Sequence, residues 1–561
     1  MAKKEKLKII PLGGIGEIGK NITALEYGGD MMLVDCGMAF PEDEMLGVDL
    51  VLPDLTYVVK NKEKLRALVL THGHEDHIGG LPFLLRDVSG VPIYATKLTL
   101  GLVRKKLEEH PNIKRPRLST IKAGDRIKAG VFEIEAINVN HSIADAVAYA
   151  IKTPVGTVVF TGDFKIDTTP IMGKMTDLAR FGELGNEGVL ALCCDSTNVE
   201  RPGFAMSERK VGLAFERIFA ASQQRIIVAT FASNVHRVQQ IINVAVKNGR
   251  KVAVSGRSME NVIEVARELG YLDIPEGEII PLDMLKRYPP EKVVVITTGS
   301  QGEPMSALYR IAFSDHKKVE IMPGDTVIIS ALPIPGNEKL VNRVINELVH
   351  LGAQVISESA DDIHVSGHAC QEEIKILINL VKPKFFIPVH GEPRHLNASR
   401  SLAQSLGYKS EDIMMMEIGK VLELDEKSAK FNGTVPSGKV FVDGLGVGDV
   451  GNIVLRDRMH LAQDGLIVLV VTLDEEGRIV AGPDVVSRGF VYVRESEALI
   501  EEIREVAQWA FENPDKKTAA GKDKKNGDWA QKKNKVRSAV AEVIYERTKR
   551  KPMILPIIME V

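Results

Sequence analysis

Four residues that could bind a metal ion lie within six positions early in the chain. His72, His74, Asp76 and His77 directly follow the apolar stretch 67–70, which has the length and composition of a buried strand. Imidazole and carboxylate side chains together suit Zn²⁺ or Mn²⁺ better than Ca²⁺ or Mg²⁺. A tight loop after a strand can direct several side chains at one point. The pattern therefore predicts a metal site at the end of a strand.

Three later residues of the same types also follow predicted strands. His141 comes after the strand at 133–139, Asp163 after 158–160 and His390 after 385–389. With the first four they make seven ligands, which is enough for two metal sites. Two neighbouring cations can stabilise both the attacking and the leaving oxygen of a phosphodiester. The alternative, a group of surface histidines without a metal, leaves these three later residues unexplained.

The elements that must position these residues form an α/β pattern in which short strands alternate with helical segments. A first pattern runs from residue 7 to about 200. A second, with strand candidates at 225–229, 251–255, 293–297 and 326–330, comes before His390 and so indicates an inserted domain. We predict a first domain in two parts, 1–208 and 369–447, an inserted domain at 209–368, a linker at 448–460 and a C-terminal domain at 461–561.

Composition limits the functional classes. The 561 residues are enough for several domains, and the formal net charge of -3 means that any contact with nucleic acid depends on a local patch. The four cysteines are too few for a disulfide framework and form no Cys-x-x-Cys pair, so a reducing compartment fits best. The longest apolar stretch, at 466–473, is too short to span a membrane. We expect a cytoplasmic protein.

The order and spacing of the ligand residues resemble the metallo-β-lactamase superfamily, with its motif His-x-His-x-Asp-His followed by single His, Asp and His ligands. The resemblance implies an αββα sandwich and two divalent metals, Zn or Mn, per subunit. It makes Asp35 a residue that orients a ligand. The ligand sets that it implies are His72, His74 and His141 for one metal, Asp76, His77 and His390 for the other, and Asp163 as the bridge.

The 227 positions from Asp163 to His390 resemble the insertion of the β-CASP subgroup of nucleases, whose cap domain closes over the metal centre. Asp195, in Cys-Cys-Asp-Ser-Thr-Asn, and His368, in His-Val-Ser-Gly-His-Ala, match the subgroup's motifs, as does His390 in Pro-Val-His-Gly-Glu. We expect Asp195 or His368 to protonate the leaving oxygen, a role that suits imidazole near neutral pH. Asp76 is included among the catalytic residues. An ordinary buried pair is the alternative for His364 and His368.

Over its full length the chain resembles the ribonuclease J family. The resemblance rests on Pro-Leu-Gly-Gly-Ile-Gly-Glu-Ile-Gly at 11–19, Thr-His-Gly-His-Glu-Asp-His-Ile-Gly-Gly at 71–80, Phe-Ala-Ser-Asn-Val-His-Arg at 231–237 and Thr-Gly-Ser-Gln-Gly-Glu-Pro at 298–304. It implies a bacterial 5′-to-3′ exonuclease and endonuclease of RNA maturation, including rRNA, and of mRNA decay, with a preference for 5′-monophosphate ends. Because all seven ligands are kept, the chain resembles the catalytically active type. The alternatives are a nuclease that acts on DNA or on RNA 3′ ends, and a mainly structural subunit of an RNA-decay assembly.

The resemblance also implies further binding residues. The 5′-phosphate pocket would comprise His364, Val365, Ser366, Gly367, His368, Ser233 and Asn234. Small residues at 366–369 would let backbone N–H groups contact the phosphate. A structural Ca²⁺ would use Asp49 and Asp443.

The remaining features concern partners and one misleading motif. Gly14, Gly16 and Gly19 match a dinucleotide-binding pattern, but a strand at 21–27 replaces the helix that NAD binding requires, so we expect a turn near the active site.

Residues 516–537 hold nine Lys or Arg and two Asp, a pattern that is typical either of a solvated loop or of a contact with RNA or a partner. Apolar strands at 466–473 and 490–493 predict that the C-terminal domain forms homo-oligomers, dimers or tetramers. A paralogous subunit and other RNA-decay enzymes are further expected partners.

Overall fold

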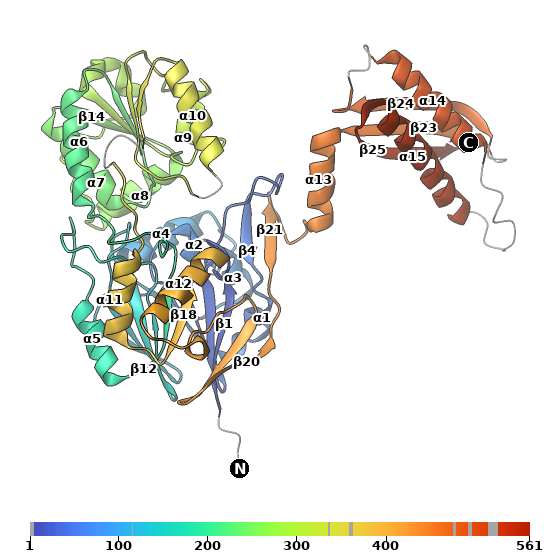
Figure 1. Cartoon of the computed structure of the whole chain (residues 1–561). Coiled ribbons are helices and arrows are strands. Elements are labelled where there is room, and N and C mark those ends of the chain that lie inside the picture. Colours follow the sequence, from blue (N-terminus) through green and yellow to red (C-terminus); the bar gives the residue numbers. More distant parts are fainter. Residues whose placement is uncertain are drawn as a thin grey trace. The chain divides into compact units, whose positions relative to one another are not determined.

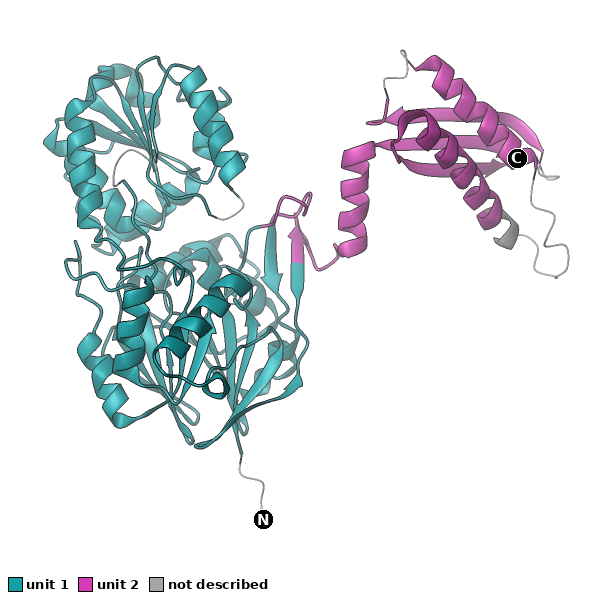
Figure 2. Cartoon of the chain, viewed as in Figure 1, with its two compact units in different colours: residues 1–40, 50–440 teal, residues 41–49, 441–561 magenta. Residues whose placement is uncertain are grey.

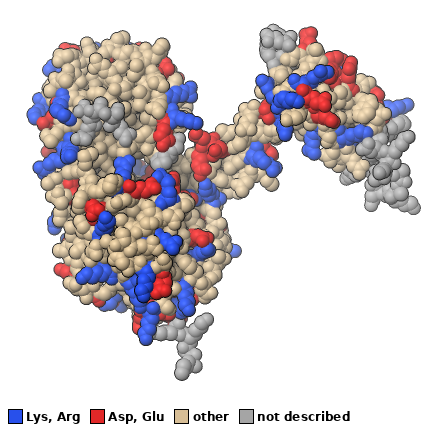
Figure 3. Space-filling model, viewed as in Figure 1, with Lys and Arg blue, Asp and Glu red and all other residues tan. Residues whose placement is uncertain are grey.

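The computed structural model describes residues 5–114, 116–334, 337–357, 363–474, 478–491, 496–513 and 526–561, with side chains in the last range from 530 onward. The chain forms two compact units (Figure 2), one comprising Met1–Phe40 with Leu50–Val440 and the other Pro41–Asp49 with Phe441–Val561. On the visible face of the larger unit, Lys and Arg are interspersed with Asp and Glu (Figure 3). Among the described residues, none of the helices combines the length and apolar character needed to span a bilayer.

Two large sheets form the lower part of the larger unit in Figure 1. The first contains, in spatial order, β20 (Ala429–Thr434), β19 (Lys420–Leu424), β1 (Leu7–Gly13), β2 (Ile22–Tyr27), β3 (Asp30–Val34), β5 (Leu65–Val69), β6 (Pro92–Ala95) and β7 (Arg117–Thr120). The second contains β18 (Phe385–Val389), β12 (Val189–Asp195), β11 (Gly156–Phe160), β10 (Val147–Thr153), β9 (Phe132–Asn138) and β8 (Arg126–Ala129). A short strand β4 (Leu50–Pro53) also belongs to this unit.

The two sheets pack face to face. Leu25 and Val69 of the first sheet share one buried cluster with Phe132, Val158 and Ile387 of the second. Separate clusters join the outer faces to helices. The helices on the first sheet are α2 (Glu75–Ile78), α3 (Leu81–Asp87) and α4 (Lys97–Glu108), and those on the second are α5 (Leu178–Glu187), α11 (Gln371–Val381) and α12 (Pro393–Ser405). The predicted αββα sandwich is confirmed.

The inserted segment forms a parallel sheet with helices on both faces (Figure 1). Its strands, in spatial order, are β14 (Lys251–Ser255), β15 (Val293–Thr297), β13 (Ile226–Ala229), β16 (Thr326–Ile329) and β17 (Gln354–Ile356). Its helices are α6 (Arg209–Ala221), α7 (Val235–Lys247), α8 (Arg257–Glu268), α9 (Ala307–Ala312) and α10 (Glu338–His350).

The insertion contacts the sandwich directly through α4 and α8. A Cβ on Gly101 of α4 would lie 2.7 Å from side-chain carbons of Val265 and Leu269, so a larger residue there would require these side chains to shift. Lys97 Nζ donates to the carbonyl oxygen of Leu269 at 2.9 Å. Tyr271 of the insertion hydrogen-bonds Asp145, which lies four residues after the predicted ligand His141.

The smaller unit consists of a three-stranded sheet covered by two helices. The sheet order is β24 (Ile479–Arg488), β23 (Leu466–Leu473) and β25 (Met553–Glu560), and the covering helices are α14 (Glu497–Glu512) and α15 (Asn526–Thr548). Two short strands, β21 (Lys439–Asp443) and β22 (Gly446–Val447), pair antiparallel. Of the predicted strand at 490–493, Phe490 is buried beyond the end of β24, Val491 is not in a strand, and the last two residues lie outside the described ranges.

The segment predicted as a linker at 448–460 is largely helical. Helix α13 spans Asn452–Asp464, directly after the last glycine of the glycine-rich run at Gly451. Those thirteen residues contain no Gly or Pro, so nothing in their local conformational preference interrupts a helix. The domain boundaries themselves stay predictions.

Candidate metal centre

Three parallel neighbouring strands bring distant parts of the chain to one edge of the second sheet. In the order β11, β12 and β18, each strand is followed or ended by a predicted site residue, namely Asp163, Asp195 and His390. Asp195 pairs in register with Val389, the residue before His390. Because parallel strands end at the same edge, these side chains meet although more than 190 positions separate Asp195 from His390.

The loop after β5 carries the first four predicted ligands. It leaves β5 at Val69 and enters α2 with His74 at the N-cap position. The loop is held by backbone hydrogen bonds from Asn21 to the carbonyl oxygen of Asp76 at 2.9 Å and from Cys36 to that of His77 at 2.8 Å. A Cβ on Gly37 would lie 1.6 Å from the Asp76 carbonyl oxygen, so glycine is required there.

The first group of ligand atoms comes from His72, His74, His141 and Asp163. Each of the four residues offers one ligand atom, and these four atoms lie within 4.8 Å of one another. His74 Nδ1 is 3.0 Å from His72 Nε2 and 3.1 Å from His141 Nε2. Asp163 Oδ2 lies 3.6 Å from His72 Nε2 and 3.7 Å from His141 Nε2.

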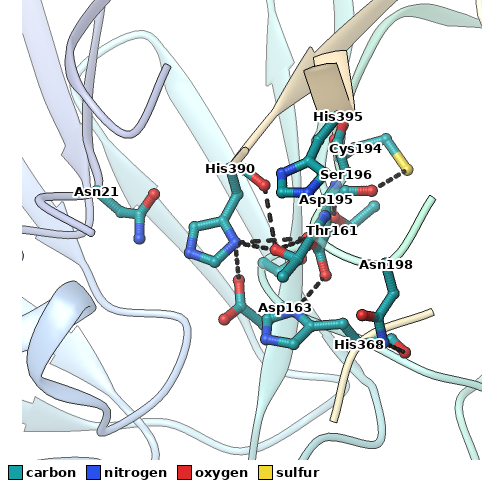
Figure 4. A network of polar contacts seen from close by, with 12 residues as sticks. Asn21, Thr161, Asp163, Cys194, Asp195, Ser196, Asn198, His368, His390 and His395 are labelled. Atoms are coloured by element: carbon teal, nitrogen blue, oxygen red, sulfur yellow. Dashed lines mark hydrogen bonds and ion pairs between the residues drawn. The ribbon is translucent and has the colours of Figure 1, made fainter. Parts of the chain in front are cut away.

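The second group comes from Asp76, His77, His390 and the same Asp163. His77 Nε2 is 3.3 Å from Asp163 Oδ2 and 3.5 Å from Asp76 Oδ2. His390 Nε2 is 3.2 Å from Asp76 Oδ2. Figure 4 shows the contacts of His390 with Asp163 and with Asp195, and that of Asp195 with His368. Asp163 is thus the one residue that belongs to both groups.

These spacings fit divalent cations. Two ligand atoms that each lie about 2.1 Å from a tetrahedral zinc ion are about 3.4 Å apart. The distances given above range from 3.0 to 3.7 Å. The two groups can therefore each hold a cation with little movement, and the seven predicted ligands are the residues that would hold them.

In two of the imidazoles a neighbouring oxygen hydrogen-bonds Nδ1, and this contact decides which ring nitrogen faces the centre. His77 Nδ1 is 2.8 Å from a carboxylate oxygen of Asp35, and His141 Nδ1 is 2.8 Å from the carbonyl oxygen of Gly367. Both oxygens can only accept, so each Nδ1 carries the proton and each Nε2 is left for a metal. Asp35 has the orienting contact that the resemblance implies.

Burial and neighbouring charges shift the pKa of some ligand histidines downward and of others upward. Burial lowers the pKa of His72 and His141 well below the ordinary value, and that of His74 to about 4. For His77 and His390, burial lowers the pKa, but the carboxylates around them, above all Asp163, raise it well above the ordinary value. The centre thus concentrates buried carboxylate charge that a divalent cation can neutralise, with release of protons.

His368 and Asp195 form a hydrogen-bonded pair beside both groups. His368 Nδ1 lies 2.7 Å from Asp195 Oδ2, and the His368 ring is centred 5.0 Å from that of His141 and 5.5 Å from that of His390. Burial lowers the pKa of His368, but Asp195 and Asp163 raise it more, so the net shift is upward. A protonated imidazole can donate to a leaving oxygen here. Asp163, Asp195, His368 and His390 also form a third cluster of possible ligands.

The predicted phosphate pocket lies against the metal centre. Gly367 contacts His141 through its carbonyl oxygen, and the Ser366 hydroxyl accepts from Asn198 Nδ2 at 2.7 Å. His364 Nδ1 accepts from Arg237 at 2.9 Å, and burial together with Arg237 lowers the pKa of His364 to about 2. His364 is therefore a neutral acceptor.

The insertion contributes the other predicted pocket residues. Asn234 caps α7, accepting the Arg237 N–H at 3.1 Å, and Ser233 immediately precedes it. Arg237 is completely buried, is paired with Glu208 at 2.8 Å and reaches His364. The contact from α7 to residue 364 therefore connects the two parts of the predicted pocket.

Two residues of the site were missed by the sequence reasoning. Asn21 Nδ2 lies 3.1 Å from His77 Nε2 and 3.3 Å from Asp76 Oδ2, and Figure 4 shows its amide facing His390. Thr197 Oγ1 lies 2.6 Å from His390 Nδ1 and donates to Asp195 Oδ1 at 2.8 Å. The available signals were the position of Asn21 directly after the glycine-rich loop and of Thr197 inside the Asp195 motif.

Three other predicted features lie in the following places. The loop containing Gly14 is a turn at the site, and the Gly14 carbonyl oxygen accepts the His390 N–H at 2.9 Å. Asp49 accepts the Gly444 N–H at 2.7 Å, whereas Asp443 pairs with Arg458. Of the basic segment 516–537, residues 516–525 lie outside the described ranges.

Four stretches of the chain match family models. They are a β-lactamase superfamily domain at residues 30–179, the ribonuclease J β-CASP domain at 223–348, a Zn-dependent metallo-hydrolase RNA specificity domain at 354–414 and the ribonuclease J C-terminal domain at 453–561. Together they span the sandwich, the insertion and the C-terminal unit.

Full-length relatives show the same similarity. The chain is 44% identical to ribonuclease J2 of Bacillus subtilis, with 100% of both chains covered. It is 45% identical to ribonuclease J of Thermus thermophilus, covering 99% of this chain and 96% of that one, and 44% identical to ribonuclease J 1 of Streptococcus pyogenes, covering 99% and 98%. A solved structure of a protein of unknown function from Enterococcus faecalis covers 75% of this chain and 100% of its own at 16% identity and a TM-score of 0.52, which shows the fold alone.

Proposed function

The chain belongs to the ribonuclease J family, and we therefore propose that it degrades RNA as a 5′-to-3′ exonuclease that prefers 5′-monophosphate ends and also cuts internally. It is a metal-dependent ribonuclease, and RNA is its substrate. The observation that carries the proposal is the meeting of two ligand groups at Asp163, with the Asp195–His368 pair within reach of both. We propose two cations, Zn²⁺ or Mn²⁺, held by the seven ligands as described.

The side chains divide the work of phosphodiester hydrolysis. Bound divalent cations supply Lewis acidity and neutralise charge at the scissile phosphate. Asp35 and the Gly367 carbonyl oxygen keep the ligand imidazoles oriented, and Asp163 fixes the spacing of the two groups. His368, whose pKa is raised chiefly by Asp195 against the effect of burial, donates its proton to the leaving oxygen.

The 5′-end preference rests on the position of the segment 364–368. It lies beside His141 and carries His368, so a terminal phosphate bound there is held close to the cations. A fixed terminal phosphate would set which bond lies beside His368 and the candidate ligands, and this would favour stepwise release of nucleotides. The contact of Arg237 with His364 supports the inclusion of Ser233 and Asn234 in the same proposed pocket.

The cellular role that we propose is RNA maturation, including that of rRNA, and mRNA decay. The chain is of the active type because all seven ligands are present and close together. The decisive experiment is metal-replete digestion of end-labelled RNA that carries either a 5′-monophosphate or a 5′-triphosphate, with product sizes resolved. Mononucleotides released from the 5′ end of the monophosphate RNA are expected. Release only from the 3′ end, or cleavage only of DNA, would overturn the proposal.

We also propose that the C-terminal unit joins copies of the chain into a dimer or tetramer. Strand β23 alternates buried and half-buried residues, so one sheet face packs on α14 and α15 and the other is open. The open face carries Leu555, Ile557 and Met559, which are 48%, 38% and 48% exposed. An exposed apolar sheet face of this kind favours association.

Replacing Ile557 by Asp places a charge on that face, and light scattering is expected to show a smaller particle. Val349 is also exposed and lies in the other unit, so Val349→Asp is the matched control. An unchanged particle mass for the Ile557 variant would remove the open face as the interface.

A calcium ion at Asp49 and Asp443 rests on the family resemblance. Calcium requires six to eight oxygen ligands. Asp443 is paired with Arg458, so calorimetric titration of the wild type and of Asp49→Asn with Ca²⁺ is the direct measurement. Equal heats for both proteins would exclude this site.

A further inference from the structure

The C-terminal unit contains a concave site that neither the metal centre nor the open sheet face explains. Its volume is about 530 Å³. It lies between α13, α15 and the residues that lead into β25, and its lining includes His460, Arg537, Tyr545 and Lys551. The volume is within the range of about 300 to 1,000 Å³ that is usual for ligand sites.

An exposed aromatic ring at this site has two ammonium groups close to it. Tyr545 is 44% exposed, although it belongs to a helix whose opposite side, with Val536, Val540 and Ile544, is fully buried. Lys549 Nζ and Lys551 Nζ each lie 5.1 Å from the centre of the tyrosine ring. Neither ammonium group has a carboxylate partner among the residues that the structure describes.

The surrounding charge is positive. The sequence from 531 to 554 contains eight Lys or Arg and two Glu. Some of these cations are used internally, since Arg547 pairs with Glu502 at 2.7 Å. At the site itself Arg537 donates to the uncharged side chain of Asn534 at 2.9 Å, and Glu542 is the acidic residue of the lining.

This combination selects one class of ligand. A small anion or an acidic peptide would use the cations but has no need of an exposed flat ring. Single-stranded nucleic acid uses both, because its bases stack on aromatic side chains while its phosphates contact Lys and Arg. An exposed cation–π contact is weak, so a base can displace an ammonium group from the ring. The released ammonium groups are then next to the phosphates that flank the stacked base.

We propose that this site binds a single-stranded segment of RNA outside the metal centre, with a base stacked on Tyr545 and the backbone held by Arg537, Lys549 and Lys551. The proposal rests on the proposed function in one respect, that RNA is the ligand. It adds a second anchor for substrates longer than the stretch that the metal centre contacts.

The test is equilibrium binding of a long unstructured RNA to the full-length chain, measured by fluorescence anisotropy over a range of salt concentrations. His74→Ala is present in every protein so that the RNA is not cut. Tyr545→Ala is expected to weaken binding by about fivefold or more, which is the lower limit for loss of one base–aromatic stack. Tyr545→Phe keeps the ring and is expected to restore most of the affinity.

Salt dependence separates phosphate contacts from other effects of the cations. For single strands the slope of log K against log salt is about 0.7 per phosphate contact. Lys551→Gln and Arg537→Gln are therefore each expected to reduce the slope by about 0.7. A loss of affinity with an unchanged slope would contradict the assignment of these cations to the RNA backbone.

The chain offers a matched control in Trp509. This ring is 56% exposed and has Lys535 Nζ at 5.4 Å from its centre, but it is not part of the concave lining. Trp509→Ala should bind RNA like the parent. Equal losses in the Trp509 and Tyr545 variants, or a Tyr545 variant that binds like the parent, would overturn the proposal.

Two further readouts keep the outcomes distinct. A changed particle mass for Tyr545→Ala in light scattering would identify the site as an interface between copies of the chain and refute RNA binding there. Cleavage of RNA by the protein with His74 intact tests the proposed function separately. If the wild type cleaves RNA and Tyr545→Ala binds it normally, this site is refuted while the proposed function stands.

Discussion

Replacing Asp195 by Asn tests the assignment of His368 as the general acid. Asp195 accepts from His368 Nδ1 at 2.7 Å, and its charge, with that of Asp163, outweighs burial and raises the pKa of His368. The protonated imidazole is the acid. Activity that depends on protonated His368 is therefore present below the raised pKa of His368 and is lost as the pH rises through that pKa.

The expected size of the effect follows from that hydrogen bond. A hydrogen bond to a charged group contributes about 1.5–3 kcal/mol, and one pKa unit corresponds to about 1.36 kcal/mol. Asparagine keeps the shape but removes the charge, so the pKa of His368 should fall by about one to two units. The alkaline limb of the rate profile moves to lower pH by the same amount.

The assay is single-turnover cleavage of 5′-monophosphate RNA as a function of pH, at saturating metal. Asp195 Oδ1 is also 3.4 Å from His390 Nδ1, so the metal content of both proteins is measured alongside. A rate that is lower at every pH, with the alkaline midpoint unmoved and the metals retained, would refute His368 as the acid. Loss of metal would assign Asp195 to holding His390 instead.

Three further changes address the metals and the stability of the pocket. His74→Ala removes the ligand atom that lies 3.0 Å from the His72 ligand atom and 3.1 Å from that of His141. Atomic absorption should show the loss of one equivalent of metal. The rate of RNA cleavage should fall by about a hundredfold or more. Asn21→Ala removes the amide that contacts Asp76 and His77 and should weaken metal affinity by about 10- to 100-fold, with activity recovered in excess metal. The control is Asn397→Ala, at an exposed position. Equal metal affinities of the Asn21 and Asn397 variants would contradict a positioning role for Asn21. Arg237→Met leaves the carboxylate of Glu208 buried without its partner and should lower the free energy of unfolding in urea by about 3–5 kcal/mol, whereas a loss below about 1 kcal/mol would show that this ion pair contributes little.

The candidate metal ligands could be identified from the sequence because each follows an apolar strand. Four of them lie after β5, and His141, Asp163 and His390 lie after β9, β11 and β18. Such a strand is recognisable from a few adjacent residues, and the carboxyl ends of neighbouring parallel strands share one edge of a sheet. The fold class followed from the same local pattern together with the family resemblance.

Local pattern was less informative where no regular element was expected. The glycine-rich run before residue 452 suggested a linker, yet the residues after it form α13. The apolar stretch at 490–493 suggested a strand, but Phe490 is buried beyond the end of β24, so its apolar character reflects core packing and not strand pairing.

Only the tertiary structure decided which atoms meet at the centre. The contact of His141 with Gly367 joins residues 226 positions apart, and that of Asn21 with Asp76 joins residues 55 apart. A single hydrogen bond between two distant loops leaves no periodic trace in either loop, so Asn21, Thr197 and the orientation of each imidazole had to be read from the packed molecule. The sequence determined the chemical groups that are available, and the packing of the two sheets and the insertion determined their geometry.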